Sequence, residues 1–544
     1  MFRNLFLAGA KNLEAKKEYI NELNVFPVPD GDTGTNMTLT IMSAAREVAA
    51  LPEDADLKSV CKAMSSGSLR GARGNSGVIL SQLFRGMCKV LKGLDGQITI
   101  EDLVQSFDKA VESAYKAVMK PTEGTILTVA KGVYEKASEY DNDADMEEFI
   151  DAVLVHAQKV LDSTPEMLPV LKQAGVVDSG GAGLLEVLKG AQRYFRGEEM
   201  DLGISDTTES APEEEGSVKS EGPKSKYTYD MAFTILLSRN FNIKQEQDFL
   251  KYLESMGDHA SIKVVEDTAA MTVHTDDPGL VFQRALSFGE LTDISIVNQH
   301  AGGKQAPKAE EAPAQAPADD PSTWKDAGFI TISVGEGISA VFKDLGVDQI
   351  ISGGQTMNPS TDDILHAISL VPAKTIYVLP NNKNIIMAAN QARDLTGDKE
   401  IVVVPSKTIP QGIAAIISFA PDLSGEENLA AMTEAMSMVA TGQVTYAVRD
   451  TQIDGKEIHE NDIMGIGDKG ILAVGKQIDE TTIEMIDIMM SENSGELISI
   501  YFGEDIKQSE AEELAKKLKD KYAGCDIELI SGGQPIYYYL ISIE

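Results

Sequence analysis

The chain has 544 residues, which is too long for one hydrophobic core and predicts three or four domains of roughly 100–200 residues each. Its 48 Lys and Arg residues stand against 85 Asp and Glu residues, giving a formal net charge of −37. A field of that sign repels phosphate backbones and anionic lipids, so nucleic acid is excluded as a favourable partner.

The cysteines and the apolar stretches predict where the protein resides. Cys61, Cys88 and Cys525 lie far apart and show neither metal-ligand nor redox spacing, which favours a reducing compartment. Charged residues interrupt the first twenty positions, and no later stretch approaches the ~20 apolar residues of a membrane span. We therefore expect a cytoplasmic protein without stable membrane insertion.

Residues 1–200 are predicted to form an all-α domain. Apolar residues recur at three- and four-residue steps in 103–118, 126–137 and 149–161, which is the period of a helix with one buried face. Ordinary core packing accounts for this pattern, so the sequence gives no sign of a cavity for a long acyl tail.

Two segments of biased composition, 201–226 and 301–325, are predicted linkers. Between them, residues 227–300 alternate extended and helical patterns in the order β-α-β-β-α-β. That order favours a small α+β domain of the split β-α-β, ferredoxin-like type, a common scaffold for interfaces. A homodimer through this domain is therefore plausible.

Residues 326–544 alternate short β-branched runs with helical stretches, which is typical of an α/β domain with a parallel sheet and crossover helices. The sequence Ile-Ser-Gly-Gly-Gln occurs at 351–355 and again at 530–534. Each copy ends a strand-like run, so the domain is predicted to contain two related halves, although five residues can recur by chance.

The sharpest chemical signal is the segment 24–37, NVFPVPDGDTGTNM. Prolines stiffen its backbone, and glycines free the backbone around Asp30 and Asp32. Carboxylate oxygens are the ligands that Mg²⁺ prefers, and one or two of them usually join substrate phosphates in its coordination shell. Asn24 offers a neutral oxygen nearby. Taken alone, the motif also suits a solvated turn, because Asp and Gly are common turn formers.

Three further glycine-rich clusters shift the balance toward phosphate binding. Residues 66–77, SGSLRGARGNSG, precede an apolar helical stretch, so bare N–H groups and a helix dipole would meet an anion there. Residues 121–125 and 178–183 also lead into helices, where they would serve equally well as simple caps. None of these clusters contains a Walker A or a Gly-x-Gly-x-x-Gly pattern, which argues against a P-loop or Rossmann site in them.

Together these motifs resemble the ATP-binding domain of dihydroxyacetone kinases, and the whole chain resembles the ATP-binding component of bacterial fatty-acid kinase. The second resemblance includes the segments 276–279, 353–360 and 532–537. It implies a barrel of antiparallel helices that binds ATP and Mg²⁺, then a middle domain, then a carboxyl-terminal domain that docks a separate fatty-acid-binding carrier protein.

The resemblance also implies roles for individual residues. Asp30 and Asp32 would be the catalytic, magnesium-binding carboxylates, with Asn24 near the place of a third ligand. The residues implied to contact the nucleotide are Thr33, Thr35, Asn36, Asn75, Ser76, Gly77, Thr125, Asp178, Ser179 and Gly180.

The middle domain departs from the family pattern. Relatives resemble a Cys plus His-x-His metal site, whereas this chain has Asp230 and Thr272 at two of those positions and keeps only His274. A structural zinc ion is therefore not expected there.

The implied activity is an ATP- and Mg²⁺-dependent phosphorylation of a carrier-bound fatty acid, giving an acyl phosphate for phospholipid synthesis. A carboxylic acid with a reference pKa of about 4 is already ionised at neutral pH, so its carboxylate needs no general base. Two alternatives stay open at this point: a glycerone (dihydroxyacetone)-type kinase, and a non-catalytic ATP-binding regulator.

Overall fold

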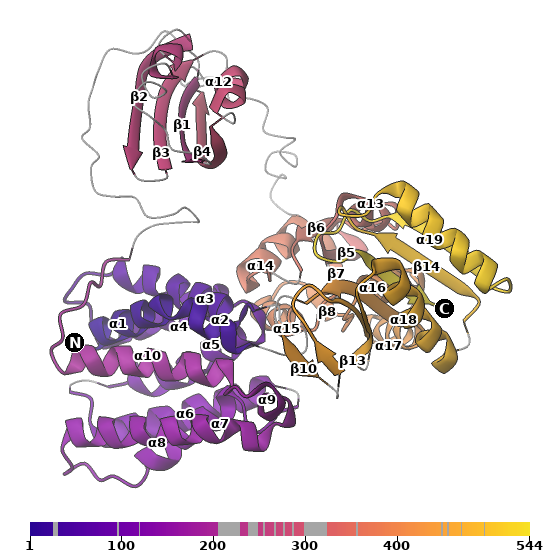
Figure 1. Ribbon diagram of the computed structural model, residues 1–544. Coiled ribbons are helices and arrows are strands. Elements are labelled where there is room, and N and C mark those ends of the chain that lie inside the picture. The colour runs from indigo at the N-terminus through magenta and orange to yellow at the C-terminus, as the bar shows by residue number, and fades with distance from the viewer. Residues whose placement is uncertain are drawn as a thin grey trace. The chain divides into compact units, whose positions relative to one another are not determined.

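A computed structural model gives the fold (Figure 1). The residues that it describes are 1–24, 31–94, 97–118, 120–204, 229–237, 249–253, 256–265, 268–275, 278–285, 288–298, 324–354, 357–447, 450–453, 456–468, 470–493 and 495–544. They belong to two units, one made of Met1–Ser205 with Asp319–Glu544 and the other of Asp206–Ala318. Most of both predicted linkers lies outside the described residues.

The first part of the larger unit is helical, as the sequence predicted. Its helices are α1 (Phe2–Ala15), α2 (Lys17–Leu23), α3 (Thr33–Ala49), α4 (Leu57–Arg70), α5 (Gly74–Leu91), α6 (Ile100–Ala117), α7 (Ile126–Ala137), α8 (Met146–Met167), α9 (Pro169–Ala174) and α10 (Ser179–Phe195). The long helices lie side by side in Figure 1. No described helix of the chain combines the length and the apolar character that a bilayer crossing requires.

Polar contacts fix the direction of these helices. Arg3, at the start of α1, donates to the carbonyl oxygens of Val48 (3.3 Å) and Ala49 (3.0 Å) at the end of α3. Its neighbour Asn4 donates to the hydroxyl of Tyr194 near the end of α10, at 2.8 Å. The amino ends of α3 and α10 therefore lie at the opposite end of the helical domain from the start of α1.

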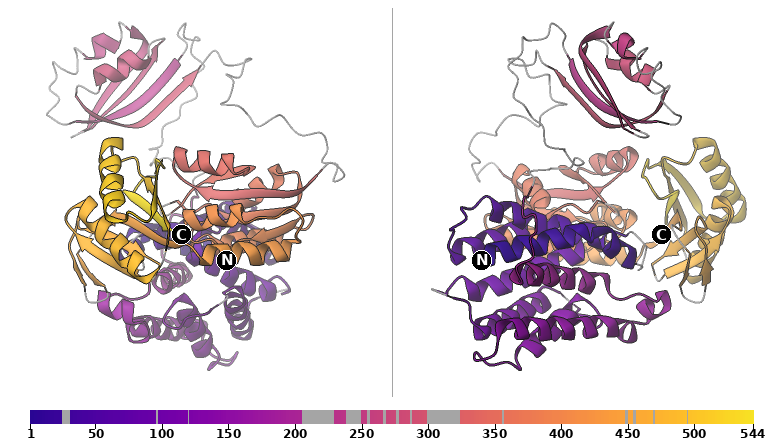
Figure 2. Two further views of the ribbon diagram at one scale, coloured as in Figure 1. Left: turned by 90° about the vertical axis from the view of Figure 1, so that its right-hand side faces the viewer. Right: turned by 60° about the vertical axis from the view of Figure 1, so that its left-hand side comes forward.

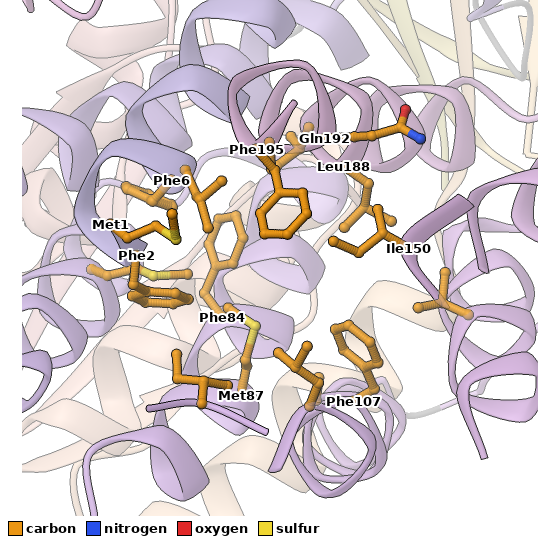
Figure 3. A pocket seen from close by; sticks show the side chains of 18 of the residues that line it. Met1, Phe2, Phe6, Phe84, Met87, Phe107, Ile150, Leu188, Gln192 and Phe195 are labelled. Atoms are coloured by element: carbon orange, nitrogen blue, oxygen red, sulfur yellow. The ribbon is translucent and has the colours of Figure 1, made fainter. Parts of the chain in front are cut away.

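The helical domain encloses an apolar cavity of about 800 Å³ (Figure 3). Its lining comes mostly from the first halves of α1, α4, α6 and α8 and the second halves of α5 and α10, with Ala130 and Val133 of α7, so it lies toward the end where α1 begins. Labelled side chains around it are Phe2, Phe6, Phe84, Phe107 and Phe195. The expectation that core packing fills this space was wrong, because helical periodicity shows which face is buried and not how closely opposing faces meet.

The second part of the larger unit contains two sheets. A four-stranded sheet has the order β6-β5-β7-β8, and its described strand pairs are parallel. Its strands are β5 (Lys325–Ser333), β6 (Gln349–Ser352), β7 (Ala373–Leu379) and β8 (Glu400–Val403). Its helices are α13 (Glu336–Asp344), α14 (Thr361–Leu370), α15 (Ile386–Leu395), α16 (Ile409–Ile417) and α17 (Gly425–Ser437).

A six-stranded sheet with the order β13-β12-β9-β16-β14-β15 follows. Its elements are β9 (Ala440–Tyr446), β12 (Ile463–Gly467), β13 (Gly470–Gly475), α18 (Ile478–Glu492), β14 (Leu497–Phe502), α19 (Gln508–Lys521), β15 (Asp526–Ser531) and β16 (Tyr539–Ile543), with a small hairpin of β10 (Thr451–Ile453) and β11 (Lys456–Ile458).

The predicted parallel sheet is right for the first of these sheets and wrong for the second. Among the described strand pairs of the second sheet, β14 and β15 alone are parallel. Antiparallel neighbours such as β12 and β13 are joined by a short turn, which leaves no alternation of strand and helix in the sequence.

The repeated Ile-Ser-Gly-Gly-Gln sequence marks equivalent places in the two sheets. One copy begins in the last two residues of β6, which pairs in parallel with β5 after helix α13. The other begins in the last two residues of β15, which pairs in parallel with β14 after helix α19. The carbonyl oxygen of Gly532 accepts hydrogen bonds from the backbone N–H groups of Gly337 and Ile338, both at 3.1 Å. The second copy therefore contacts the helix that precedes the first.

The smaller unit is one four-stranded sheet with helices on one face (Figure 2). Strands β1 (Tyr229–Leu237), β2 (Gly257–Val265), β3 (Thr268–Thr275) and β4 (Gly289–Asn298) have the order β2-β3-β1-β4, and its pairs are antiparallel. Alternate residues of β1 and β3 are buried against helical residues 249–253 and α12 (Pro278–Ala285).

The strand register brings together the three positions at which relatives resemble a Cys plus His-x-His metal site. Asp230 lies opposite His274, two residues along β3 from Thr272. The Thr272 hydroxyl lies 2.7 Å from the hydroxyl of Ser261. Among the described residues of the chain, no three His, Cys, Asp or Glu side chains gather closely enough to hold a metal ion.

Two of the aspartates that cap helices in the helical domain lie in opposite electrostatic settings. Exposed Asp56 accepts the N–H of Ser59 at the start of α4, and hydrogen bonds from Ser59 lower the pKa of its carboxyl. Half-buried Asp178 accepts the N–H of Gly181 at the start of α10, at 2.7 Å. Burial raises the pKa of Asp178 to about 6, while backbone hydrogen bonds from Gly181 and Ile126 act in the opposite direction.

We expect the substitution Asp178→Asn to change the pH dependence of stability. A folded-state pKa of about 6, against 3.8 for an ordinary Asp, means that the ionised carboxylate costs stability above pH 6 and that this cost fades as the pH falls. Asn still caps the helix but does not titrate. Between pH 7.5 and pH 5 the wild type should therefore gain about 1 kcal/mol relative to the variant, measured by thermal unfolding with circular dichroism.

Asp56→Asn is the matched control. The lowered pKa of Asp56 stabilises the fold at every pH well above the ordinary value of 3.8 and loses that effect only at lower pH, so the stability of the wild type relative to this variant should stay constant between pH 7.5 and pH 5. Stability profiles of Asp178→Asn and the wild type that run parallel from pH 7.5 to 5 would contradict the expectation.

Candidate functional site

The amino ends of α3, α5 and α10 meet at one end of the helical domain. Gly74 begins α5 with a positive φ of 59°, and a Cβ atom there would lie 2.6 Å from Nδ2 of Asn36 in α3. A Cβ atom at Gly183 in α10 would lie 2.7 Å from the Met37 side chain of α3. Glycine is therefore required at these positions for the three helices to approach one another.

Hydrogen bonds of Asp178 hold the start of α7 beside the start of α10. Besides capping α10, its carboxylate accepts a hydrogen bond from the backbone of Ile126, the first residue of α7. Its own N–H donates to the Thr164 hydroxyl at 3.0 Å. Four helices thus begin close together, and the unpaired N–H groups and dipoles at such ends favour an anion.

A buried carboxylate lies at the start of α3. Asp32 is only 7% exposed, and its Oδ2 accepts a hydrogen bond from Nδ2 of Asn358 at 2.6 Å. Burial raises the pKa of the Asp32 carboxyl, and hydrogen bonds from Asn36 and Asn358 act in the opposite direction. The carboxylate is thus held in a desolvated setting where a cation would be bound strongly.

The donor set around Asp32 fits Mg²⁺. The side-chain oxygens of Asn75 and Asn358 are buried and have no hydrogen-bond partner among the described residues. The Asn358 oxygen belongs to the amide that donates to Asp32, whereas the Asn75 amide donates to Oδ1 of Asn384 at 3.2 Å. Mg²⁺ needs only one or two protein carboxylates when phosphates supply further oxygens.

The outcomes for the predicted metal ligands differ. Asp32 lies in this site, whereas residues 25–30, which include Asp30, lie outside the described residues. Asn24 ends α2, where its backbone N–H donates to the carbonyl oxygen of Asn21 at 3.1 Å. A shared role of Asp30, Asp32 and Asn24 in metal binding stays a prediction.

The predicted nucleotide contacts of α3 have different surroundings. Thr33 is the first residue of the helix and is half-buried. Asn36 is buried beside Asp32. Thr35 is tied to α2, because its N–H donates to Oδ1 of Asn21 (3.0 Å) and its hydroxyl accepts from Nδ2 of the same residue (3.1 Å).

In α5, Asn75 and Ser76 lie in the first turn, where N–H groups lack partners within the helix. The N–H of Gly77 instead donates to the carbonyl oxygen of Arg73 at 3.2 Å. A Cβ atom at Gly77 would lie 2.3 Å from Oγ1 of Thr40, so this glycine permits the close packing of α5 on α3.

The remaining predicted contacts begin α7 and α10. Thr125 caps α7 and donates through its hydroxyl to the carbonyl oxygen of Thr122 at 2.8 Å. Ser179 is the first residue of α10. A Cβ atom at Gly180 would lie 3.3 Å from Cβ of Ile126, so these two helix starts are in contact.

Sequence reasoning missed the contribution of the α/β part. Besides the Asn358 side chain on Asp32, the Asn358 carbonyl oxygen accepts from Nη1 of Arg73 at 2.9 Å, and the N–H of Thr361 donates to the carbonyl oxygen of Ala72 at 3.0 Å. The available signal was the Asn-Pro-Ser sequence at 358–360, where a cap follows a proline.

Family models match three consecutive parts of the chain. A "DAK2 domain" model matches residues 27–193. Two models of the FakA-like family of fatty acid kinase proteins match the remainder, the middle-domain model at 226–305 and the C-terminal model at 328–544.

Individual proteins are similar over different parts of the chain. Protein YloV of Bacillus subtilis (strain 168) is 42% identical over 557 aligned positions, covering 100% of this chain and 98% of YloV. The dihydroxyacetone kinase from C. freundii, solved in complex with AMP-PNP and Mg2+, is 16% identical, with a TM-score of 0.28, and covers 40% of this chain and 48% of that one. The Streptococcus pneumoniae Fatty Acid Kinase B3 protein loaded with linoleic acid is 16% identical, with a TM-score of 0.27, and covers 34% of this chain and 76% of that one.

The full-length identity to YloV and the three consecutive domain matches agree with one another. The chain belongs to the FakA-like family of fatty acid kinase proteins, and its helical part is a DAK2 domain.

Proposed function

We propose that this chain is the ATP- and Mg²⁺-dependent kinase component that phosphorylates the carboxylate of a fatty acid held by a separate fatty-acid-binding protein. The product is an acyl phosphate for phospholipid synthesis. The observation that carries the proposal is the meeting of four helix amino ends, one of which begins beside the buried carboxylate of Asp32.

The proposal that the site binds ATP follows from the negative charge of the phosphates, which the site must hold and neutralise. Phosphoryl transfer asks the protein mainly to position the phosphates and to neutralise the charge on the transferred group. The unpaired N–H groups at the starts of α5 and α10 suit phosphate oxygens, and Asp32 with the predicted Asp30 suits the cation that bridges them. Magnesium, when bound, draws negative charge from the phosphoryl group.

The proposal that another protein presents the fatty acid follows from the position of the apolar cavity. Helices α5 and α10, whose amino ends form the candidate site, contribute to its lining mostly from their second halves. A helix of 17 residues is about 25 Å long, so an acyl chain in the cavity would hold its carboxylate far from the phosphates. A carboxylate brought by another protein avoids this problem, and it attacks phosphorus without a general base because it is already ionised.

The finer domain assignments belong to the same proposal. The helical domain forms the barrel of the dihydroxyacetone-kinase type, the smaller unit is a ferredoxin-like domain that supports a homodimer, and the carboxyl-terminal domain docks the carrier in the cytoplasm. The strand order β2-β3-β1-β4 supports the ferredoxin-like assignment, because it is the order of a split β-α-β sheet.

We expect Asp32→Asn to lower the rate of ADP release by at least about 100-fold in the presence of ATP, Mg²⁺, a fatty acid and the carrier. The amide keeps the shape of the side chain but removes the negative charge that holds the cation. Thermal stability should stay equal or rise, because burial disfavours the charged form of Asp32. A coupled ADP assay and a melting curve measure the two effects.

Asp54→Asn, an exposed carboxylate in the turn before α4, is the control and should retain full activity. Turnover with dihydroxyacetone and none with a carrier-bound fatty acid would replace the proposal by a glycerone-type kinase. Thermal stabilisation by ATP without any ADP release would replace it by a non-catalytic regulator.

A further inference from the structure

A short segment of the α/β part, residues 357–361, lies against the candidate phosphate site. The exposed side chain of Met357 is followed by Asn358, which is only 2% exposed, and then by a proline. Within five residues the chain thus passes from the surface into contact with Asp32.

The backbone of this segment is held on both sides. The N–H of Gly354 donates to the carbonyl oxygen of Met357 at 3.2 Å, which closes the loop after β6. Pro359 confines the backbone of Asn358 to extended conformations. Ser360 then caps α14 through a reciprocal pair of hydrogen bonds with Asp363.

The helical domain holds the same segment from the other side. Nη1 of Arg73 donates to the main-chain oxygen of Asn358 at 2.9 Å, and Nη2 lies 3.6 Å from the Asp363 carboxylate. The Asn358 side chain is therefore presented to Asp32 by a backbone with little freedom to move.

A second anchor lies along α15. The buried amide of Gln391 donates to the carbonyl oxygen of Leu69 at 2.6 Å and accepts from Nε2 of Gln82 at 2.8 Å. Ala72 and Val78 share one hydrophobic core with residues of the parallel sheet. These contacts fix the α/β part on α4 and α5 independently of Asn358.

The two ends of the Asn358 amide have unequal surroundings. Its nitrogen donates to Oδ2 of Asp32, whereas its oxygen is buried without a partner among the described residues. A buried polar atom without a partner is uncommon and calls for an explanation, of which a bound water or ion is one. Asn358 thus orients one oxygen of the Asp32 carboxylate, and Asn36 also donates to this carboxylate. The two oxygens together have about four lone pairs, which is more than these two amides use and leaves capacity for a cation.

We propose that Asn358, from the α/β part of the chain, is a positioning residue of the kinase site that orients the Asp32 carboxylate for Mg²⁺. The inference rests on the proposed function and adds that the helical domain alone does not form the complete site. Hydrogen-bond partners of a metal ligand fix its orientation and commonly change metal affinity by about 10- to 100-fold when they are removed.

The test is a magnesium titration of the full chain with a non-hydrolysable ATP analogue, followed by thermal shift. Asn358→Ala should raise the half-saturating Mg²⁺ concentration by about 10- to 100-fold. The melting temperature without ligands should change little, because Gln391 and Arg73 still hold the two parts together. If the alanine variant does not fold, Asn358→Leu keeps the volume, removes both polar atoms and should give the same shift.

Two matched variants separate positioning from general packing. Met357→Ala changes an exposed neighbour in the same segment and should leave the titration unchanged. Gln391→Met weakens the contact between the two parts without touching Asp32, and it should lower the melting temperature with a small effect on the Mg²⁺ requirement.

Three results would overturn the inference while leaving the proposed function intact. The first is a half-saturating Mg²⁺ concentration that is unchanged in Asn358→Ala. The second is a lower half-saturating Mg²⁺ concentration in that variant, which would mean that the amide blocks the carboxylate. The third is a rise in this concentration in Gln391→Met that equals the rise in Asn358→Ala. A wild-type chain that shows no joint stabilisation by Mg²⁺ and the ATP analogue would overturn the proposed function and the inference with it.

Discussion

A buried carboxylate remains charged only where nearby groups replace the water that it has lost. Asp32 is in that position at the start of α3, and the amides of Asn36 and Asn358 supply part of the replacement. The close approach of α5 to α3 at Gly74 makes this setting possible, because any side chain there would displace Asn36. The rest of the candidate site is arranged around this desolvated charge.

The sequence predicted the elements whose signal is local. The helical period of residues 126–137 corresponds to α7, and the β-branched runs near 329, 375 and 401 correspond to β5, β7 and β8. The glycine cluster at 178–183 leads into a helix as predicted, whereas the cluster at 66–77 begins inside the last turn of α4 and only its second part starts α5. Asp178 was predicted either as a cap or as a nucleotide contact, and the capping role is present in the structure.

Features that depend on distant residues were not predictable in the same way. The pairing of β9 with β16 and the bond between Asp32 and Asn358 join residues far apart in the chain, and neither partner carries a local mark of the other. The cavity beside Phe84 and Phe195 was missed for a related reason. Its volume depends on how helices from separate segments pack, whereas each segment alone shows only an apolar face.

The hydrogen bond between Asp32 and Asn358 also has a consequence for the order in which the site forms during translation. The two residues are 326 positions apart in the chain, and the smaller unit is encoded between them. At a synthesis rate of about 5–20 residues per second, roughly 16 to 65 seconds pass on the ribosome between the emergence of the first and of the second. Throughout that interval the nascent helical domain holds Asp32 without its amide partner, so the site matures only late in translation.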